Sequence, residues 1–300
     1  MSAPWLMVAA SLLFAVMGVC VKLASVQYGA GEIVLYRSLV GLAMMLAVMR
    51  WRGLSWRTRV PAMHFWRSVT GTTALCLWFV AIGGLPLATA MTLNYMSSVW
   101  IALFLIGGSV LLAPDRGGSG LIDGRLVAAV LTGFGGVALV LRPTIEQEQL
   151  WFGLVGLGSG LIAATAYLQV SALGRIGEPG ERVVLYFSVT GVVFGAAIAL
   201  ASGGLHAHTA QGLLLLGAIG GLATLAQWMM TRAYGTGATL GIAALQYLGI
   251  VFSFLLGVLV FDERLTLWSG VGVMLIVTAG VAATLLRPRP RNDIAATTES

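Results

Sequence analysis

The feature that most constrains this sequence is a succession of apolar runs, each long enough to cross a lipid bilayer. A helix needs about 20 residues to span the hydrocarbon core. Runs of this kind occupy residues 5–24, 31–49, 65–84, 86–112, 123–141, 151–173, 182–202, 211–231, 238–260 and 266–286. Of all residues 58% are hydrophobic and only 9% are charged, whereas soluble domains are about a quarter charged. The sequence therefore predicts an all-α integral membrane protein of about ten transmembrane helices.

The basic residues gather in alternate loops, which predicts the orientation in the membrane. Arg50, Arg52, Arg57, Arg59 and Arg67 flank the second loop, and Arg287, Arg289 and Arg291 follow the last apolar run. Because cytoplasmic loops carry the excess of Lys and Arg, we expect a multi-pass protein of the cytoplasmic (inner) membrane with both termini in the cytoplasm. The net charge of +6 then reflects topology and gives no support to nucleic-acid binding.

The two halves of the sequence repeat each other. Val34-Leu35-Tyr36, followed by Ser38 and Gly41, returns as Val184-Leu185-Tyr186, followed by Ser188 and Gly191, at a spacing of 150 residues (184 − 34). Asn94-Tyr95 returns as Gln246-Tyr247, at a spacing of 152 (246 − 94). Each half contains an odd number of runs, so the second enters the membrane in the opposite orientation. We expect two inverted five-helix repeats, 1–148 and 149–287, and a disordered cytoplasmic tail, 288–300; such repeats are typical of secondary transporters with alternating access.

Polar side chains in the middle of two apolar runs predict a binding site between them. Asn94, Tyr95 and Ser98 share one helical face, and the later run carries Gln246, Tyr247 and Ser253. Polar groups at membrane depth are costly unless they meet each other or line a wet cavity. Amides and hydroxyls suit an ammonium and a carboxylate, and tyrosine rings add stacking and cation–π contacts. The alternative is a set of interhelical hydrogen bonds that only hold helices together, each contributing about 0.6 kcal/mol.

Aromatic and charged residues inside the runs extend this candidate site. Trp78, Trp100, Tyr167 and Trp228 lie within their runs, away from the interfacial positions where membrane tryptophans usually occur, and Gln227 belongs to a polar stripe of the eighth run. They are candidate cavity walls, with ordinary packing as the alternative. Lys22 and Arg37 lie toward the expected external side, where they either snorkel to the interface or form a gate that recognises a carboxylate. Glu32 could pair with either of them.

Three segments resemble the drug/metabolite transporter superfamily, in its EamA-type ten-helix branch. They are Glu32-Ile-Val-Leu-Tyr-Arg37-Ser38, Leu85-Pro-Leu-Ala-Thr-Ala90 and Phe261-Asp-Glu-Arg-Leu265. The likeness extends from Trp5 to Leu286. The stretch Asn94–Trp100 and the many tryptophans are most similar to the bacterial aromatic amino acid exporters. The resemblance implies export of aromatic and large apolar amino acids through a central cavity.

The sequence lacks the side-chain patterns of a proton relay, a metal site or a catalytic site, which limits the functions to be considered. No carboxylate lies near the middle of a run, so no buried proton relay is visible. His64, His206 and His208 fall in expected loops, and neither a metal motif nor a catalytic motif occurs. We therefore expect no enzyme activity, no cofactor and no metal. The expected partners are a small-molecule substrate and the bilayer, with a second copy of the chain as a further candidate partner. The open alternatives are transport of a sugar phosphate, nucleotide sugar or drug-like compound, and a membrane scaffold or enzyme subunit. A sugar phosphate would require several basic groups at the midplane, where the sequence is expected to have none.

Overall fold

The protein is a bundle of α-helices. The computed structural model describes residues 2–101, 103–104, 147–237, 245–263 and 267–285, with isolated helical positions at 128, 132–133, 135–136 and 139 and one at 242. Its helices are α1 (Ala3–Ala24), α2 (Ala30–Trp51), α3 (Pro61–Gly84), α4 (Leu87–Tyr95), α7 (Gln147–Arg175), α8 (Gly180–Ala201), α9 (Ala210–Thr236), α11 (Leu248–Phe261) and α12 (Leu267–Leu285). Six of these described helices, α1, α2, α3, α7, α8 and α9, are long and apolar enough to cross a membrane.

Most helix ends follow from local sequence. Proline occupies the start of α3, where its missing N–H leaves no intrahelical hydrogen bond unmade. The hydroxyl of Thr209 caps α9 by accepting a hydrogen bond from the backbone N–H of Gly212 at 3.0 Å. Asp262 ends α11 with a φ of 49°, a left-handed conformation that aspartate tolerates better than most residues.

The described helices match most of the predicted runs, with two main differences. α3 begins at Pro61 rather than at residue 65. The run 86–112 does not form one uninterrupted helix over its described part, because α4 ends at Tyr95 and helix resumes at Ser97 after Met96. Most of the run 123–141, the start of 238–260 and the tail 288–300 lie outside the described residues, so the total of ten helices stays a prediction.

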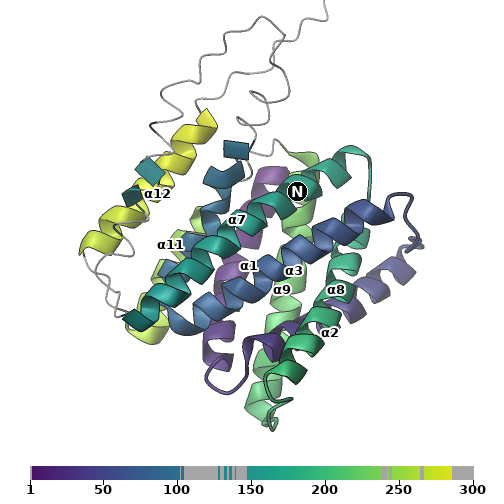
Figure 1. Ribbon diagram of the computed structural model, residues 1–300. Helices are drawn as coiled ribbons and strands as arrows, with labels where there is room; N and C mark the ends of the chain where they lie inside the picture. Colours follow the sequence, from purple (N-terminus) through teal and green to yellow (C-terminus); the bar gives the residue numbers. More distant parts are fainter. Residues whose placement is uncertain are drawn as a thin grey trace, which may run out of the picture.

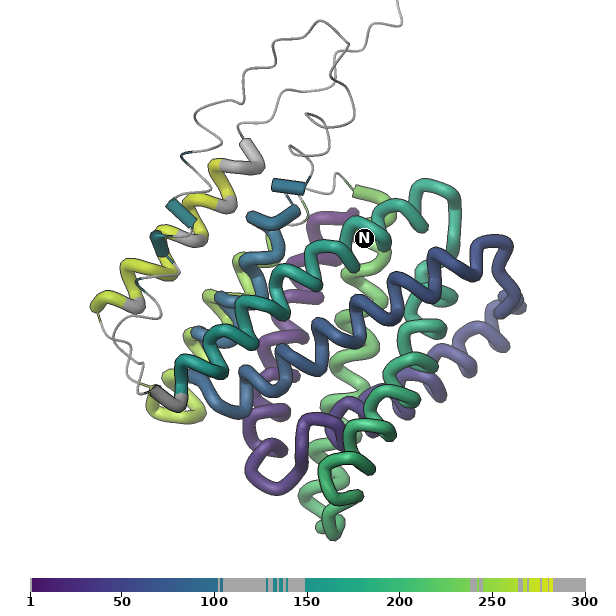
Figure 2. The backbone as a smooth tube through the Cα atoms, in the orientation of Figure 1, coloured from purple at the N-terminus to yellow at the C-terminus, as the bar shows by residue number. Residues whose placement is uncertain are grey.

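The helices pair across the two halves of the sequence. The most extensive contacts join α2 to α8, α1 to α9 and α3 to α7. In Figure 1, α3 and α7 run side by side at the front of the bundle, with α1 and α9 behind them. The tube in Figure 2 shows α12 at the margin of the bundle, on the side of α11. α4 packs against α7 and α11.

Small residues allow these helices to approach closely. A Cβ added to Gly191 of α8 would lie 2.2 Å from Oγ of Ser38 in α2, and one added to Gly41 of α2 would lie 2.9 Å from Oγ of Ser188 in α8. The contact is reciprocal and uses the serine and glycine of both copies of the repeated pattern. Gly160 of α7 is equally close to α4, since its Cβ would lie 2.6 Å from the carbonyl oxygen of Leu93.

Candidate substrate site

A cavity of about 50 Å³ lies at the centre of the bundle. It is lined by Met7, Ser11, Phe14, Arg37, Arg67, Gly71, Ala74, Leu75, Trp78, Asn94, Tyr95, Ala163, Ala166, Tyr167, Phe187, Gln227 and Gln246. A water molecule needs about 10–15 Å³ of such space, whereas pockets for small molecules measure about 300–1,000 Å³. The cavity therefore has room for water but not for a metabolite, and a metabolite could bind here only if the helices around it separated.

Two buried arginines dominate the electrostatics of this cavity. Arg37 of α2 is 3% exposed and Arg67 of α3 is 2% exposed. Their guanidinium carbons lie 5.0 Å and 4.5 Å from the centre of the same ring, that of Phe187 in α8. Within the described part of the chain neither arginine has an acidic partner, and Nε of Arg37 and both Nε and Nη1 of Arg67 have no hydrogen-bond partner.

Both arginines correct expectations from the sequence. Arg67 was expected to flank a loop, but α3 begins at Pro61, which places Arg67 about 9 Å along the helix at 1.5 Å per residue. Arg37 was expected to snorkel or to form an external gate; it is 3% exposed and lines the central cavity, so it does not snorkel, while the gate stays a prediction. Two basic side chains therefore lie buried inside the bundle, although the absence of basic groups at the membrane midplane stays a prediction.

Several other predicted site residues meet at the cavity. Trp78, Asn94, Tyr95, Tyr167, Gln227 and Gln246 all line it. Nδ2 of Asn94 also donates to Oγ of Ser159 in α7 at 3.0 Å, so this amide holds two helices together as well as facing the cavity. The ring of Tyr95 lies against Gly249 of α11, whose added Cβ would be 2.6 Å from it. The two polar stretches predicted from the sequence are thus neighbours.

Five predicted site residues do not line the cavity: Ser98, Trp100, Trp228, Tyr247 and Ser253. Ser98 and Tyr247 are buried and face each other away from it, and Ser253 is buried within α11. Nε1 of Trp228 donates to Oε1 of Glu181 at 3.1 Å, outside the cavity. A helical wheel identifies which residues share a face, but it does not give the rotation of that helix within the bundle.

Arg67 and Phe187 are the important cavity residues that the sequence reasoning did not identify. The repeat itself could have found Phe187, because this residue occupies the position of Arg37 in the second copy, 150 residues later (187 − 37). Pro61 could have revealed Arg67, since a proline at the first helical position is a common start signal. Its use would have placed Arg67 inside the span.

An ion pair closes one end of the bundle, here named the Glu263 end. Lys22 of α1 pairs with Glu263, which follows α11, and its Nζ also donates to the carbonyl oxygen of Leu85 at 3.3 Å. The backbone N–H of Leu87 donates to Oε1 of Glu263 at 2.9 Å, so the carboxylate caps the N-terminus of α4. α1, α4 and α11 are thereby joined.

Glu32 pairs with two histidines and not, as expected, with Lys22 or Arg37. Its Oε2 is 2.8 Å from Nδ1 of His206, and its Oε1 is 3.3 Å from Nε2 of His208. Both histidines belong to the segment between α8 and α9, as predicted. No group of three or more metal-binding side chains occurs in the part of the chain that the structure describes.

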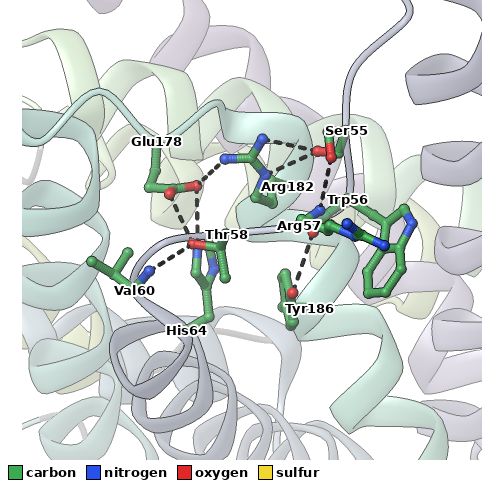
Figure 3. Close-up of polar contacts among 9 residues, drawn as sticks. All are labelled: Ser55, Trp56, Arg57, Thr58, Val60, His64, Glu178, Arg182 and Tyr186. Atoms are coloured by element: carbon green, nitrogen blue, oxygen red, sulfur yellow. Dashed lines mark hydrogen bonds and ion pairs between the residues drawn. The ribbon is translucent and has the colours of Figure 1, made fainter.

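A second polar cluster, shown in Figure 3, closes the opposite end, here named the Glu178 end. The carboxylate of Glu178 accepts hydrogen bonds from Thr58 at 2.8 Å and from Nη1 of Arg182 at 2.7 Å, and its Oε2 lies 3.2 Å from Nε2 of His64. Nη2 of Arg182 donates to the carbonyl oxygen of Ser55 at 2.8 Å. His64 was expected in a loop but lies in the first turn of α3, fully buried.

The Glu178 cluster joins the segment between α2 and α3 to the segment between α7 and α8. Burial raises the pKa of the Glu178 carboxyl, but the hydrogen bonds from Arg182, Thr58 and His64 outweigh it and leave the pKa below its ordinary value. Nearby, Arg52 pairs with Glu181. The α3 helix connects the two ends of the bundle, and its 24 residues separate them by about 35 Å.

The chain is similar along nearly its whole length to curated bacterial transporters. It is 30% identical over 277 residues to the pseudopaline exporter CntI of Pseudomonas aeruginosa, a match covering 92% of this chain and 94% of that protein. It is 28% identical over 284 residues to an uncharacterized transporter of Helicobacter pylori, covering 92% of each, and 26% identical over 282 residues to the riboflavin transporter of Vibrio cholerae, covering 91% and 90%.

Two further comparisons bear on the fold and the family. A solved crystal structure superposes with a TM-score of 0.69 at 21% identity, covering 95% of this chain and 96% of the other, which shows a shared fold. No family model matches the sequence. The relatives are transporters and not enzymes. The protein is therefore a multi-pass membrane transporter of small metabolites, and it belongs to the family of bacterial transporters that includes the pseudopaline exporter CntI.

Proposed function

We propose that this transporter exports small amphipathic metabolites that carry a carboxylate, with aromatic and large apolar amino acids as the first class to test. The observation that carries the proposal is the central cavity, in which aromatic rings, amides and guanidinium groups converge. Trp78, Tyr95 and Tyr167 offer apolar faces to a substrate side chain. The amides of Asn94, Gln227 and Gln246 can accept from an ammonium and donate to a carboxylate.

The mechanism that we propose is alternating access between two inverted halves. In the proposed repeat, α1, α2 and α3 correspond to α7, α8 and α9. Exchanging the two halves would therefore turn the α1–α9 contact into the α7–α3 contact and leave the α2–α8 contact unchanged. These three are the most extensive contacts in the bundle. The cavity lies between two polar closures, at the Glu263 end and at the Glu178 end. With both termini in the cytoplasm, the Glu178 end would face the cytoplasm and the Glu263 end the outside.

Transport by the purified protein in liposomes tests this proposal. We expect exchange of labelled phenylalanine and methionine above protein-free liposomes, with and without a pH gradient. Asn94→Ala and Gln246→Ala should each lower the rate by about tenfold or more, because each removes a polar group that faces the cavity. Ser253→Ala is the matched control, since Ser253 is buried outside the cavity.

Two outcomes would contradict the proposal at different levels. If no amino acid moves while riboflavin or another metabolite does, the amino-acid assignment is wrong and the cavity serves another substrate. If Asn94→Ala and Gln246→Ala transport normally, these amides serve only helix packing. Size-exclusion profiles of the variants must match that of the wild type for either conclusion.

A further inference from the structure

Arg37 and Arg67 present an electrostatic problem that the remainder of the described structure leaves unsolved. Buried charges in proteins are normally paired, because removing an ion from water costs several kcal/mol even after relaxation. Here two like charges share one cavity and the same aromatic ring, and both side chains are at least 97% buried. By contrast, the buried carboxylate of Glu181 pairs with Arg52, and the half-buried carboxylate of Glu178 pairs with Arg182.

We infer that Arg37 and Arg67 form an anion-binding subsite for a substrate carrying two negative charges close together, either two carboxylates or one phosphate monoester. The inference rests on the proposed function, export of amphipathic metabolites that carry a carboxylate, and moves the preferred substrate from amino acids with one carboxylate to metabolites with two negative charges. A single carboxylate would leave one guanidinium without a partner in a closed cavity. Two carboxylates or a dianionic phosphate would neutralise both.

The geometry around the two arginines suits this task. Guanidinium groups bind carboxylate and phosphate oxygens through paired N–H groups in a fixed planar fork. Both guanidinium carbons lie within 5.0 Å of the centre of the Phe187 ring, so this ring contacts both groups. Gly71 leaves room for Arg67, since a Cβ at this position would lie 2.2 Å from Nη1 of Arg67 and 3.1 Å from the Phe187 ring.

The aromatic part of the cavity gives the substrate its second feature. Trp78, Tyr95 and Tyr167 line the cavity together with the two arginines, and the ring of Trp78 packs edge-on against Phe14 at 6.2 Å between centroids. The expected substrate therefore combines a doubly charged acidic group with an apolar or aromatic body. A compact inorganic anion would leave these rings without a partner.

Thermal unfolding of the purified protein in detergent tests the subsite without relying on transport. The probes are benzylsuccinate with two carboxylates, phenyl phosphate with one phosphate monoester, and phenylalanine with a single carboxylate, all at constant ionic strength. Because a ligand stabilises the folded state that binds it, we expect a dianionic probe to raise Tm at a concentration at least tenfold lower than phenylalanine requires. The stronger of the two dianions identifies the acidic group.

Variants assign the effect to the arginines. Arg37→Gln and Arg67→Gln should each abolish the dianion-dependent rise in Tm, while Arg59→Gln, which removes a charge from an exposed loop position, should retain it. Without ligand, the Tm of the two cavity variants should be unchanged or higher, because each variant removes an unpaired buried charge. A purely structural arginine would lower it.

A glycine substitution tests the geometry with both charges kept. Gly71→Ala should weaken the response to dianions at least severalfold, whereas Gly158→Ala in α7, where an added Cβ meets nothing within 4 Å, should not. The inference is overturned if phenylalanine and the dianions act equally, or if Arg37→Gln and Arg67→Gln keep the full dianion response. Arginine-dependent binding of a dianion that the liposomes fail to transport would leave the subsite standing and contradict only the proposed function.

Discussion

At the scale of single residues, Glu178 shows how one carboxylate can hold a loop segment to the bundle. Thr58, His64 and Arg182 all meet its two oxygens, and its side chain is only 9% exposed. These bonds favour the ionised form more than burial opposes it, so the pKa of the carboxyl is lowered. The folded protein therefore holds the proton of Glu178 less tightly than the unfolded chain does.

This lowered pKa predicts a pH-dependent contribution to stability. A group with a depressed pKa stabilises the fold above its unfolded pKa, and that contribution is lost as the pH falls through the folded pKa. Glu178→Gln should therefore cost about 1–3 kcal/mol at neutral pH. The difference in Tm from the wild type should be constant down to about the ordinary pKa of 4.5 and shrink below it.

Thermal melts of both proteins between pH 7 and pH 3 measure this difference. Arg182→Gln removes a principal partner and should flatten the same pH dependence, which makes it the matched comparison. A gap between wild type and Glu178→Gln that stays constant at every pH would show that ionisation of Glu178 does not stabilise the fold.

At the scale of helices, the repeated serine and glycine residues decide how closely α2 and α8 approach. In membranes, small residues allow close van der Waals packing, which drives helix association where the hydrophobic effect is weak. Ser38 faces Gly191, and Ser188 faces Gly41. The repeat seen in the sequence is thus a set of contacting residues in the structure.

A double-mutant cycle tests this contact. Gly191→Ala places a Cβ 2.2 Å from Oγ and 3.0 Å from Cβ of Ser38, so we expect it to destabilise the protein by about 1–3 kcal/mol through overpacking. Ser38→Gly on the partner helix should restore much of this loss. Gly221→Ala in α9, where a Cβ would meet nothing within 4 Å, is the control; equal Tm values for Gly191→Ala and Gly221→Ala would contradict the prediction.

The sequence could predict the helices far better than their rotation. Apolar runs located α1, α2, α7, α8 and α9 to within a few residues, because the thickness of the bilayer sets their length. The same runs left open which face of a helix looks inward. Trp228 was therefore predicted in the cavity although its indole binds Glu181, while Arg67, near the start of its run, was counted among the residues that flank a loop.

At the scale of the whole molecule, two polar clusters hold the helices together at opposite ends of the bundle. The Lys22–Glu263 pair joins α1, α4 and α11 at one end, and the Glu178 cluster joins two connecting segments at the other. In the proposed mechanism, substrate reaches the cavity when one of these closures opens. In alternating access, weakening the closure at one end should shift the equilibrium toward the conformation that is open at that end.

Charge-neutral variants at the two ends should therefore open opposite sides of the transporter. Replacing Cys20 and Cys76, the two cysteines of the chain, and introducing Ser11→Cys gives a single thiol in the cavity wall. Glu263→Gln should raise its labelling by a membrane-impermeant maleimide from the Glu263 side, and Glu178→Gln should raise it from the Glu178 side.

The size of the effect follows from the exposure of the Lys22–Glu263 pair. Lys22 and Glu263 are 22% and 12% exposed, so solvent screens the pair and we expect a change in labelling of about fivefold, equivalent to about 1 kcal/mol. Asp262→Asn, at the exposed neighbouring position, should leave labelling unchanged, and increased labelling from the same side in both variants would rule out two opposing gates.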